Sequence, residues 1–275
     1  MNDHGIIEGR TKGRVVLRIK SMEPFSAEFT ADQIGVIADI AEKFGSGFTH
    51  VTPRQTVEIP HIDSSAVPDI THLLARHGLS PGSSGRRLRN VTACSRWCLY
   101  NASPMSEAAR KLNALLNGKV LPGKTNISLS GCEFSCVRSR TSDIGVIARS
   151  EIVITDRKCK HCSLCVKEPL GCQADAITLT EEGVEIDYQK CVRCGFCSSV
   201  CRPGVIAARS KGFDVLVGGK GGIMPREAML HSTVSCEEEM LEKVVMILER
   251  YCAMAENGER IGDVVARVGV EGLEV

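Results

Sequence analysis

Cysteines are the residues in this sequence whose number and spacing point most directly to chemistry. There are 14 of them in 275 residues. Cys191, Cys194 and Cys197 are separated from one another by two residues each, and Cys201 follows after three more residues, before Arg202-Pro203. Three thiolates at this spacing can wrap one [4Fe-4S] cubane, while the fourth reaches a neighbouring cluster. The run therefore predicts iron–sulfur ligation rather than structural disulfides.

A second run begins at Cys159 and repeats the two-residue spacing, but its distal cysteine, Cys172, follows after six residues instead of three. We expect a bacterial-ferredoxin-type module over residues 156–210 with two [4Fe-4S] clusters and crossed ligation. The two expected ligand sets are Cys159, Cys162, Cys165 with Cys201, and Cys191, Cys194, Cys197 with Cys172. The alternative is a pair of zinc sites, because four thiolates at this spacing also suit tetrahedral zinc.

Four further cysteines form two pairs, Cys94 with Cys98 and Cys132 with Cys136. A spacing of four places both thiols of a pair on the same side of a helical turn, so each pair can hold one face of a cluster. Taken alone, the pairs are as compatible with buried structural cysteines or with zinc.

The first 80 residues read as a small layer of strands and helices. Residues 14–20 alternate as a strand, and Thr30 opens a helix with capping-box spacing that ends at Gly45. Two strands, at 48–52 and 56–59, precede a helix that runs from Val67 to Gly78. The order β-α-β-β-α predicts an α+β layer, and residues 80–85 read as the loop that ends it.

The elements that follow predict a second domain interrupted by the cysteine block. A helix opened by Ser103-Pro104 and a strand at 126–130 precede the block, and a strand at 213–217 and a helix at 237–254 follow it. We therefore expect three units: residues 1–80, residues 86–155 together with 211–275, and an inserted module at 156–210.

Charge and hydropathy exclude several functional classes. The 34 Lys and Arg residues nearly balance 33 Asp and Glu residues, which argues against a nucleic-acid binder with a wide basic face. No apolar stretch approaches the roughly 18 residues needed to cross a bilayer, and the first residues lack a signal-peptide layout. We expect a cytoplasmic protein without a membrane span.

The segment Gly131-Cys132-x3-Cys136-x6-Asp143-Ile-Gly-Val146 resembles the siroheme and [4Fe-4S] signature of nitrite and sulfite reductases. Residues 36–59 resemble the ferredoxin-like half-domain of that family, and residues 214–226 and 258–271 match its later segments. The resemblance covers nearly the whole chain and is closest to the siroheme subunit of anaerobic and dissimilatory-type sulfite reductases. It implies an α+β fold with a ferredoxin-like half-domain, a siroheme/[4Fe-4S] reductase domain and an inserted two-cluster ferredoxin module.

The resemblance also implies roles for particular residues. Four cysteines of the family hold a cluster, and the last of them, which corresponds to Cys136, bridges to the siroheme iron. The four corresponding metal ligands are Cys94, Cys98, Cys132 and Cys136. Basic residues of the family grip the substrate anion on the distal face of siroheme; their positions fall on Arg54, Arg89 and Lys124. Asn126 stands where the family has a second lysine.

Siroheme carries eight carboxylates, so a siroheme protein needs further cationic and backbone N–H groups. The candidates in this sequence are arginines near the signature and a glycine-rich loop. They are Arg86, Arg87, Arg138, Arg140, Gly218, Gly219, Lys220 and Gly221.

The implied function is the six-electron reduction of sulfite to sulfide on siroheme, with electrons relayed through three [4Fe-4S] clusters in an anaerobic setting. The implied partners are a small oxyanion, an electron-donating flavin or ferredoxin protein, and a second copy or another subunit in a homo- or hetero-oligomer. Two alternatives remain open: a nitrite reductase of the same family, and a non-catalytic iron–sulfur electron-transfer subunit.

Overall fold

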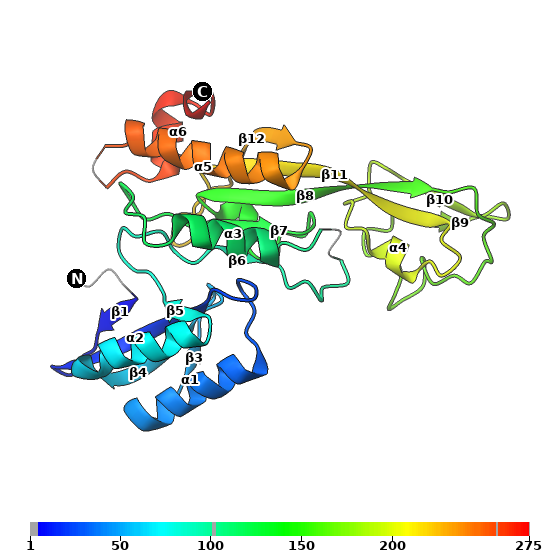
Figure 1. Cartoon of the computed structure of the whole chain (residues 1–275). Helices are drawn as coiled ribbons and strands as arrows, with labels where there is room; N and C mark the ends of the chain where they lie inside the picture. The colour runs from blue at the N-terminus through cyan, green and yellow to red at the C-terminus, as the bar shows by residue number, and fades with distance from the viewer. Residues whose placement is uncertain (1–4, 101–102, 257, 275) are drawn as a thin grey trace.

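The computed structural model describes residues 5–100, 103–256 and 258–274 (Figure 1). The chain forms an N-terminal region, a central region and a small lobe at the far end of two long strands. No helix in these described ranges is both long enough and apolar enough to span a membrane.

The N-terminal region is a five-stranded sheet that shares one buried core with two helices. The strand order is β1–β2–β4–β3, with β5 beside β2. The elements are β1 (Ile6–Glu8), β2 (Arg14–Ser21), α1 (Ala31–Phe44), β3 (His50–Val51), β4 (Val57–Asp63), α2 (Val67–Arg76) and β5 (Leu79–Pro81). The expected α+β layer is confirmed.

Local sequence rules explain the helices of this region well. Thr30 and Gln33 form the predicted capping box of α1, and Gly45 caps its other end. The region differs from expectation at its last strand: Ser80 and Pro81, predicted as loop, pair with β2 in β5. Pro81 is tolerated there because β5 pairs with a single neighbour, as an edge strand does.

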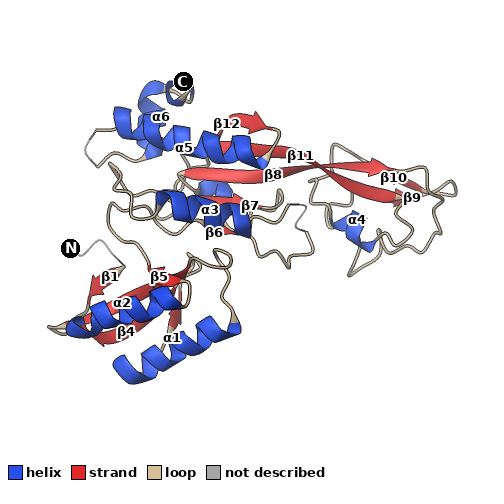
Figure 2. Cartoon of the chain, viewed as in Figure 1, coloured by secondary structure: helices blue, strands red, loops and turns tan. Residues whose placement is uncertain are grey.

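The central region is built on a sheet of order β12–β11–β8–β7–β6, in which only the β6–β7 and β7–β8 pairs are parallel (Figure 2). The helices share one core with the sheet. The elements are β6 (Thr92–Ala93), α3 (Ser106–Leu116), β7 (Ile127–Ser130), β8 (Ile144–Ile154), β11 (Ile206–Val217), β12 (Met229–Val234), α5 (Glu237–Met254) and α6 (Ile261–Val268). Helix α5 has the predicted bounds, whereas α3 begins at Ser106, after Pro104.

The lobe lies between β8 and β11 in the sequence. It holds a hairpin of β9 (Ile177–Leu179) and β10 (Val184–Ile186) and one short helix, α4 (Phe196–Val200). Its core contains only five buried hydrophobic residues, and two of them, Ile152 and Ile206, belong to the long strands. Strands β8 and β11 thus form a ribbon that joins the lobe to the central sheet (Figure 1).

Candidate functional site

A cavity of about 470 Å³ lies between the N-terminal and central regions. One wall comes from β2, β4 and the loop at 52–54, and the other comes from β7, the turns around 137–142, the loop at 221–222 and Arg260. Residues that are far apart in the sequence therefore share one chamber.

Hydrogen bonds across the two regions hold the Thr52–Gln55 loop in place. The Gln55 side chain bonds to Ala93 twice: its Nε2 donates to the carbonyl oxygen (2.6 Å) and its Oε1 accepts from the backbone N–H (2.9 Å). Asn90 Nδ2 donates to the Arg54 carbonyl oxygen at 2.9 Å. These bonds fix Arg54 in the cavity wall: Gln55 anchors the loop to the central region, and Asn90 holds the Arg54 backbone.

Cationic side chains dominate the lining of the cavity. Five of them contribute: Arg18, Arg54, Lys124, Arg138 and Arg260. Glu58 is the one acidic residue in this lining. It already accepts hydrogen bonds from Arg18 and His50, which hold its pKa below the ordinary value although burial alone would raise it. The chamber thus carries a net positive charge, because Glu58 offsets only one of the five cations in its wall.

Burial and mutual repulsion perturb these cations further. Burial lowers the pKa of Lys124, and the positive charges of Arg54 and Arg89 add a smaller lowering. Arg89 is not part of the lining, but burial and the Arg54 charge lower its pKa to about 10. Its Nε is buried without a hydrogen-bond partner among the described residues. Such a cluster is stabilised by a bound anion, because the anion removes the repulsion.

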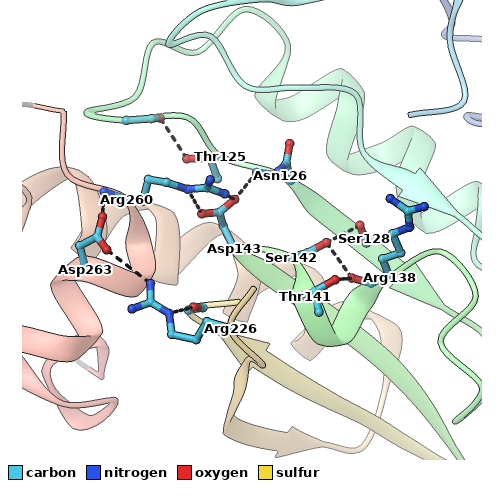
Figure 3. Close-up of polar contacts among 12 residues, drawn as sticks. Thr125, Asn126, Ser128, Arg138, Thr141, Ser142, Asp143, Arg226, Arg260 and Asp263 are labelled. Atoms are coloured by element: carbon cyan, nitrogen blue, oxygen red, sulfur yellow. Dashed lines mark hydrogen bonds and ion pairs between the residues drawn. The ribbon is translucent and has the colours of Figure 1, made fainter. Parts of the chain in front are cut away.

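A buried ion pair supports this wall (Figure 3). Arg260 donates from Nε and Nη2 to the two carboxylate oxygens of Asp143, at 2.9 and 2.6 Å. The Asn126 backbone N–H donates to Asp143 Oδ2 at 2.9 Å. Burial raises the pKa of Asp143, and the Arg260 guanidinium opposes that rise. Asp143, which belongs to the signature segment, thus holds the Arg260 side chain and the Asn126 backbone, directly before β7.

Hydroxyl groups line the opposite part of the wall, beside Arg138. Thr92 Oγ1 donates to Ser128 Oγ at 2.8 Å, and Ser128 Oγ lies 2.7 Å from Ser142 Oγ. Ser142 Oγ also donates to the Arg138 carbonyl oxygen at 3.0 Å (Figure 3). The chain of hydroxyls holds the turn that carries Arg138, whose φ of 67° is in the left-handed region.

The thiols of Cys94, Cys98, Cys132 and Cys136 gather next to this wall. Burial raises the pKa of Cys132 to about 11, and the other three thiolates raise it as well. Neither pair lies in a helix, as their spacing had suggested; both occupy turns. Val137 and Arg138, directly after Cys136, line the cavity. Cys136 is thus adjacent in sequence to the cationic chamber.

The lobe brings its eight cysteines together as two groups. Cys172, Cys191, Cys194 and Cys197 line one small cavity, and Cys159, Cys162, Cys165 and Cys201 line another. Burial raises the pKa of Cys197 to about 12, with a further rise from the thiolates of its own group. The groups are those of the crossed pattern. Among the described residues, no three His, Cys, Asp or Glu side chains converge on a single-ion position.

Two of the other candidate siroheme contacts line the cavity, and the rest contact other parts of the chain. Arg138 and Gly221 line the cavity. Arg86 donates to the Leu121 carbonyl oxygen, and Arg87 donates to that of Gly118. Arg140 pairs with Glu133 and Glu227. Of the glycine-rich loop, Gly218 accepts a hydrogen bond from Arg226, Gly219 packs against Ser142, and Lys220 pairs with Arg226 through the backbone.

Sequence reasoning missed Arg18 and Arg260 as members of the site. Arg18 is the polar residue between the buried Leu17 and Ile19, so its side chain faces away from the core of its own sheet. Arg260 belongs to the terminal segment that resembles the family, but only the folded chain shows that its side chain lines the cavity. The alternation of β2 was the one available indication for Arg18.

A ferredoxin-like half-domain and a cysteine-rich α+β domain, with a cationic chamber between them, define an iron–sulfur oxidoreductase. The model of the nitrite and sulphite reductase 4Fe-4S domain matches residues 84–274, and that of the nitrite/sulfite reductase ferredoxin-like half domain matches residues 8–77. The chain belongs to the nitrite and sulfite reductase family.

Several relatives are similar over most of the chain. An uncharacterised protein of Methanocaldococcus jannaschii is 29% identical over 88% of this chain and 84% of its own length. The coenzyme F420-dependent sulfite reductase of the same organism is 29% identical over 97% of this chain, which spans only 43% of that protein. The beta subunit of the dissimilatory-type sulfite reductase of Archaeoglobus fulgidus is 24% identical, over 86% of this chain and 71% of the subunit.

Two solved structures share the fold. The structure of dissimilatory sulfite reductase I aligns with a TM-score of 0.74 and 21% identity, over 94% of this chain and 68% of that chain. The Mycobacterium tuberculosis NirA protein aligns with a TM-score of 0.63 and 15% identity, over 94% and 38%.

Proposed function

We propose that this chain is a siroheme-dependent reductase that converts sulfite to sulfide in a six-electron reduction. The observation that carries the proposal is the cationic cavity, whose lining includes Val137 and Arg138, directly after Cys136. Relatives named as sulfite reductases, among them the F420-dependent enzyme and the dissimilatory-type beta subunit, support sulfite as the substrate.

The cavity residues fit siroheme because its carboxylates would neutralise the positive charge that remains in the wall after Glu58 and Asp143 are counted. Arg18, Arg138 and Arg260 are the proposed carboxylate partners, together with the N–H groups of the loop at 218–222. Arg86, Arg87 and Arg140 contribute from outside the described cavity. When bound, siroheme supplies an iron centre that binds the anion and takes up electrons, which no side chain can do.

The chain's own cations bind and orient the oxyanion. Arg54 stands at the cavity wall with its backbone held by Asn90, and Lys124 lies on the opposite wall. Because burial and neighbouring charges lower the pKa of Lys124, its ammonium gives up a proton more readily than that of a solvated lysine. Lys124, with Arg89 behind Arg54, is the proposed proton source through ordered water.

Three [4Fe-4S] clusters supply the electrons in this proposal. One is held by Cys94, Cys98, Cys132 and Cys136, and two occupy a ferredoxin module at residues 156–210 that interrupts the reductase domain of residues 86–155 and 211–275. The two lobe cavities, each lined by four cysteines, support this division. Two runs of three cysteines at two-residue spacing, each with a distal fourth cysteine, favour clusters over zinc.

The proposed partners follow from the open chamber and from the length of the relatives. A flavin or ferredoxin protein delivers electrons, and a second copy or another subunit completes the siroheme site. This chain spans only 43% of the F420-dependent relative. We place the reaction in an anaerobic cytoplasm because oxygen destroys exposed clusters.

Anaerobic purification under cofactor-sufficient expression tests the proposal. We expect siroheme absorption bands, about twelve cluster irons and one siroheme iron per chain, and turnover of sulfite with a reduced viologen. Cys136→Ser removes the siroheme-coupled absorption, whereas Cys252→Ser, a half-buried cysteine in α5, leaves it unchanged. Faster turnover of nitrite than of sulfite assigns the chain to nitrite instead. About eight irons and no siroheme bands identify a non-catalytic electron carrier.

A further inference from the structure

Three aromatic side chains form a contact between the lobe and the central region. Tyr100 lies two residues after Cys98, Phe134 lies between Cys132 and Cys136, and Phe196 lies between Cys194 and Cys197. The Tyr100 ring meets Phe134 edge to face at a centroid distance of 5.3 Å and meets Phe196 in a tilted arrangement at 4.4 Å. Both distances are typical of attractive aromatic pairs.

The same tyrosine has a polar contact with the lobe. Gln173 Nε2, next to Cys172, donates to Tyr100 Oη at 3.3 Å. Tyr100 thus contacts two cysteine-bearing segments of the lobe, one through its ring and one through its hydroxyl. Its third contact, Phe134, belongs to the cysteine loop beside the cationic cavity.

The two lobe cavities differ in what surrounds them. The cavity of Cys172, Cys191, Cys194 and Cys197 is also lined by Tyr100 and Phe134 of the central region. The cavity of Cys159, Cys162, Cys165 and Cys201 is lined entirely by residues between 159 and 205. The first group therefore faces the central region, and the second group lies away from it.

The ribbon alone gives the lobe a weak attachment. Between the central core, which ends at Ala148 and Phe213, and the lobe core, which begins at Ile152 and Ala208, the ribbon is polar at residues 149–151 and 209–211. Its pairing is interrupted there by a register shift between Ser210 and Phe213. A two-stranded segment without a core of its own bends easily. A second attachment is needed to fix the distance between the lobe and the central cysteines.

We propose that Tyr100 is a positioning residue that clamps the Cys172-containing group against the central cluster, which makes that group the immediate electron donor and the Cys159-containing group the entry point. The inference rests on the proposed function, since it requires the three clusters. In the step it governs, one electron leaves the Cys172-group cluster and enters the central cluster, and no bond forms or breaks.

The test uses the full-length, anaerobically purified chain, reduced with dithionite and measured by electron paramagnetic resonance. Tyr100→Phe keeps the ring and loses only the bond to Gln173, so it serves as the matched control for Tyr100→Leu. We expect Tyr100→Phe to retain the magnetic interaction between the central and lobe clusters. Tyr100→Leu weakens that interaction and slows electron transfer into the central cluster about tenfold in rapid-mixing experiments, with unchanged iron content. Equal spectra and rates for both variants overturn the clamp.

Two cysteine variants test the order of the clusters. Cys194→Ser removes the cluster beside Tyr100 and abolishes the interaction, whereas Cys162→Ser removes the outer cluster and preserves it. The reverse result overturns the assignment, as does a chain whose central cysteines hold no iron. Failure of the proposed function has a different readout: absent siroheme bands or absent sulfite turnover leave these magnetic and kinetic results in place.

Discussion

The cationic cavity and the cysteine lobe are built in opposite ways. The cavity draws its side chains from segments between Arg18 and Arg260, and a buried ion pair and inter-region hydrogen bonds hold them. The lobe is local: its cysteines lie within residues 159–201, around a core of five buried hydrophobic residues. Long-range contacts of the fold bring the cavity residues together. The lobe has few such contacts, so we expect its folding to depend on what its cysteines bind.

The two regions should therefore respond to different perturbations: the lobe to the loss of metal, and the cavity wall to a change in charge. A lobe with so small a core needs covalent or metal cross-links to stay folded. The cavity wall concentrates positive charge, and the loss of Glu58 or Asp143 would leave more of that charge unbalanced. Metal removal and charge removal therefore act on different regions, and four experiments separate them.

The largest effect is expected from iron removal. Anaerobic oxidation and chelation of the clusters should unfold the lobe, because cluster binding replaces the missing core. Limited proteolysis should then cleave within residues 156–205 while the N-terminal region stays intact. Cys162→Ser removes one of the two lobe clusters and should therefore give only partial cleavage without chelation, whereas Cys252→Ser should give none. A lobe that resists protease after complete iron loss would show that its own packing is sufficient.

Breaking the buried ion pair should destabilise the central region next. Asp143→Asn leaves the guanidinium of Arg260 without its carboxylate in a buried setting, which costs about 3–5 kcal/mol. Denaturant unfolding measures the loss. The control is Glu227→Gln, whose ion pair with Arg140 is long and exposed and should change stability by less than about 1 kcal/mol. Similar losses in both variants would contradict the role given to Asp143.

The free energy of unfolding should depend on pH through a lysine at the junction of the two regions that enclose the cavity. Lys20 is 1% exposed and donates to Asn117 Oδ1 at 2.9 Å, and burial lowers its pKa from 10.5 to about 8. Between these two values the unfolded chain binds the proton more strongly, so stability rises with pH across that window. The rise attributable to Lys20 is about 3 kcal/mol.

Comparison with Lys20→Met isolates the contribution of Lys20 to the pH dependence of stability. The variant should lack the rise between pH 8 and 10.5, while Lys43→Met, on the exposed side of α1, should retain it. Urea unfolding of all three proteins across this range gives the slopes directly. Parallel slopes in wild type and Lys20→Met would mean that the lysine reaches water in the folded state.

The smallest of the four effects concerns substrate binding. Arg54→Gln removes one charge from the cavity wall and should raise the KM for sulfite about 10- to 100-fold, because a charge-assisted hydrogen bond contributes about 1.5–3 kcal/mol. Steady-state turnover with a reduced viologen measures it. Arg54→Lys keeps the charge and should recover part of the affinity. An unchanged KM in Arg54→Gln would place the anion elsewhere.

Local patterns in the sequence predicted the elements that local physics determines. The Thr30 capping box fixed the start of α1, and helical periodicity gave α5 its bounds. The two groups of lobe cysteines were predicted from their spacing and the crossed ligation rule, and the same eight side chains line two small cavities. These features need no knowledge of distant residues.

The cavity required the fold. Arg18 and Arg260 are separated by more than 200 residues, and no local pattern says that their charges meet. The pair Cys94 and Cys98 misled in another way: a spacing of four suggests a helical turn, but the segment is held as an irregular turn after β6. Tertiary contacts, such as the bond from the Cys94 N–H to the Leu129 carbonyl oxygen, override the local preference there.

The ribbon of β8 and β11 also has a fixed length. One end closes beside the cavity, where the Gly218 N–H donates to the Asp143 carbonyl oxygen, and the other ends where the Ile206 N–H meets Cys201 Sγ. Each residue pair adds about 3.4 Å, so two added pairs would lengthen the ribbon by about 7 Å and keep every side chain on its face. A single insertion in one strand would turn the outer half over. The ribbon therefore limits how far the lobe can lie from the cavity, and that limit changes in steps of two residues per strand.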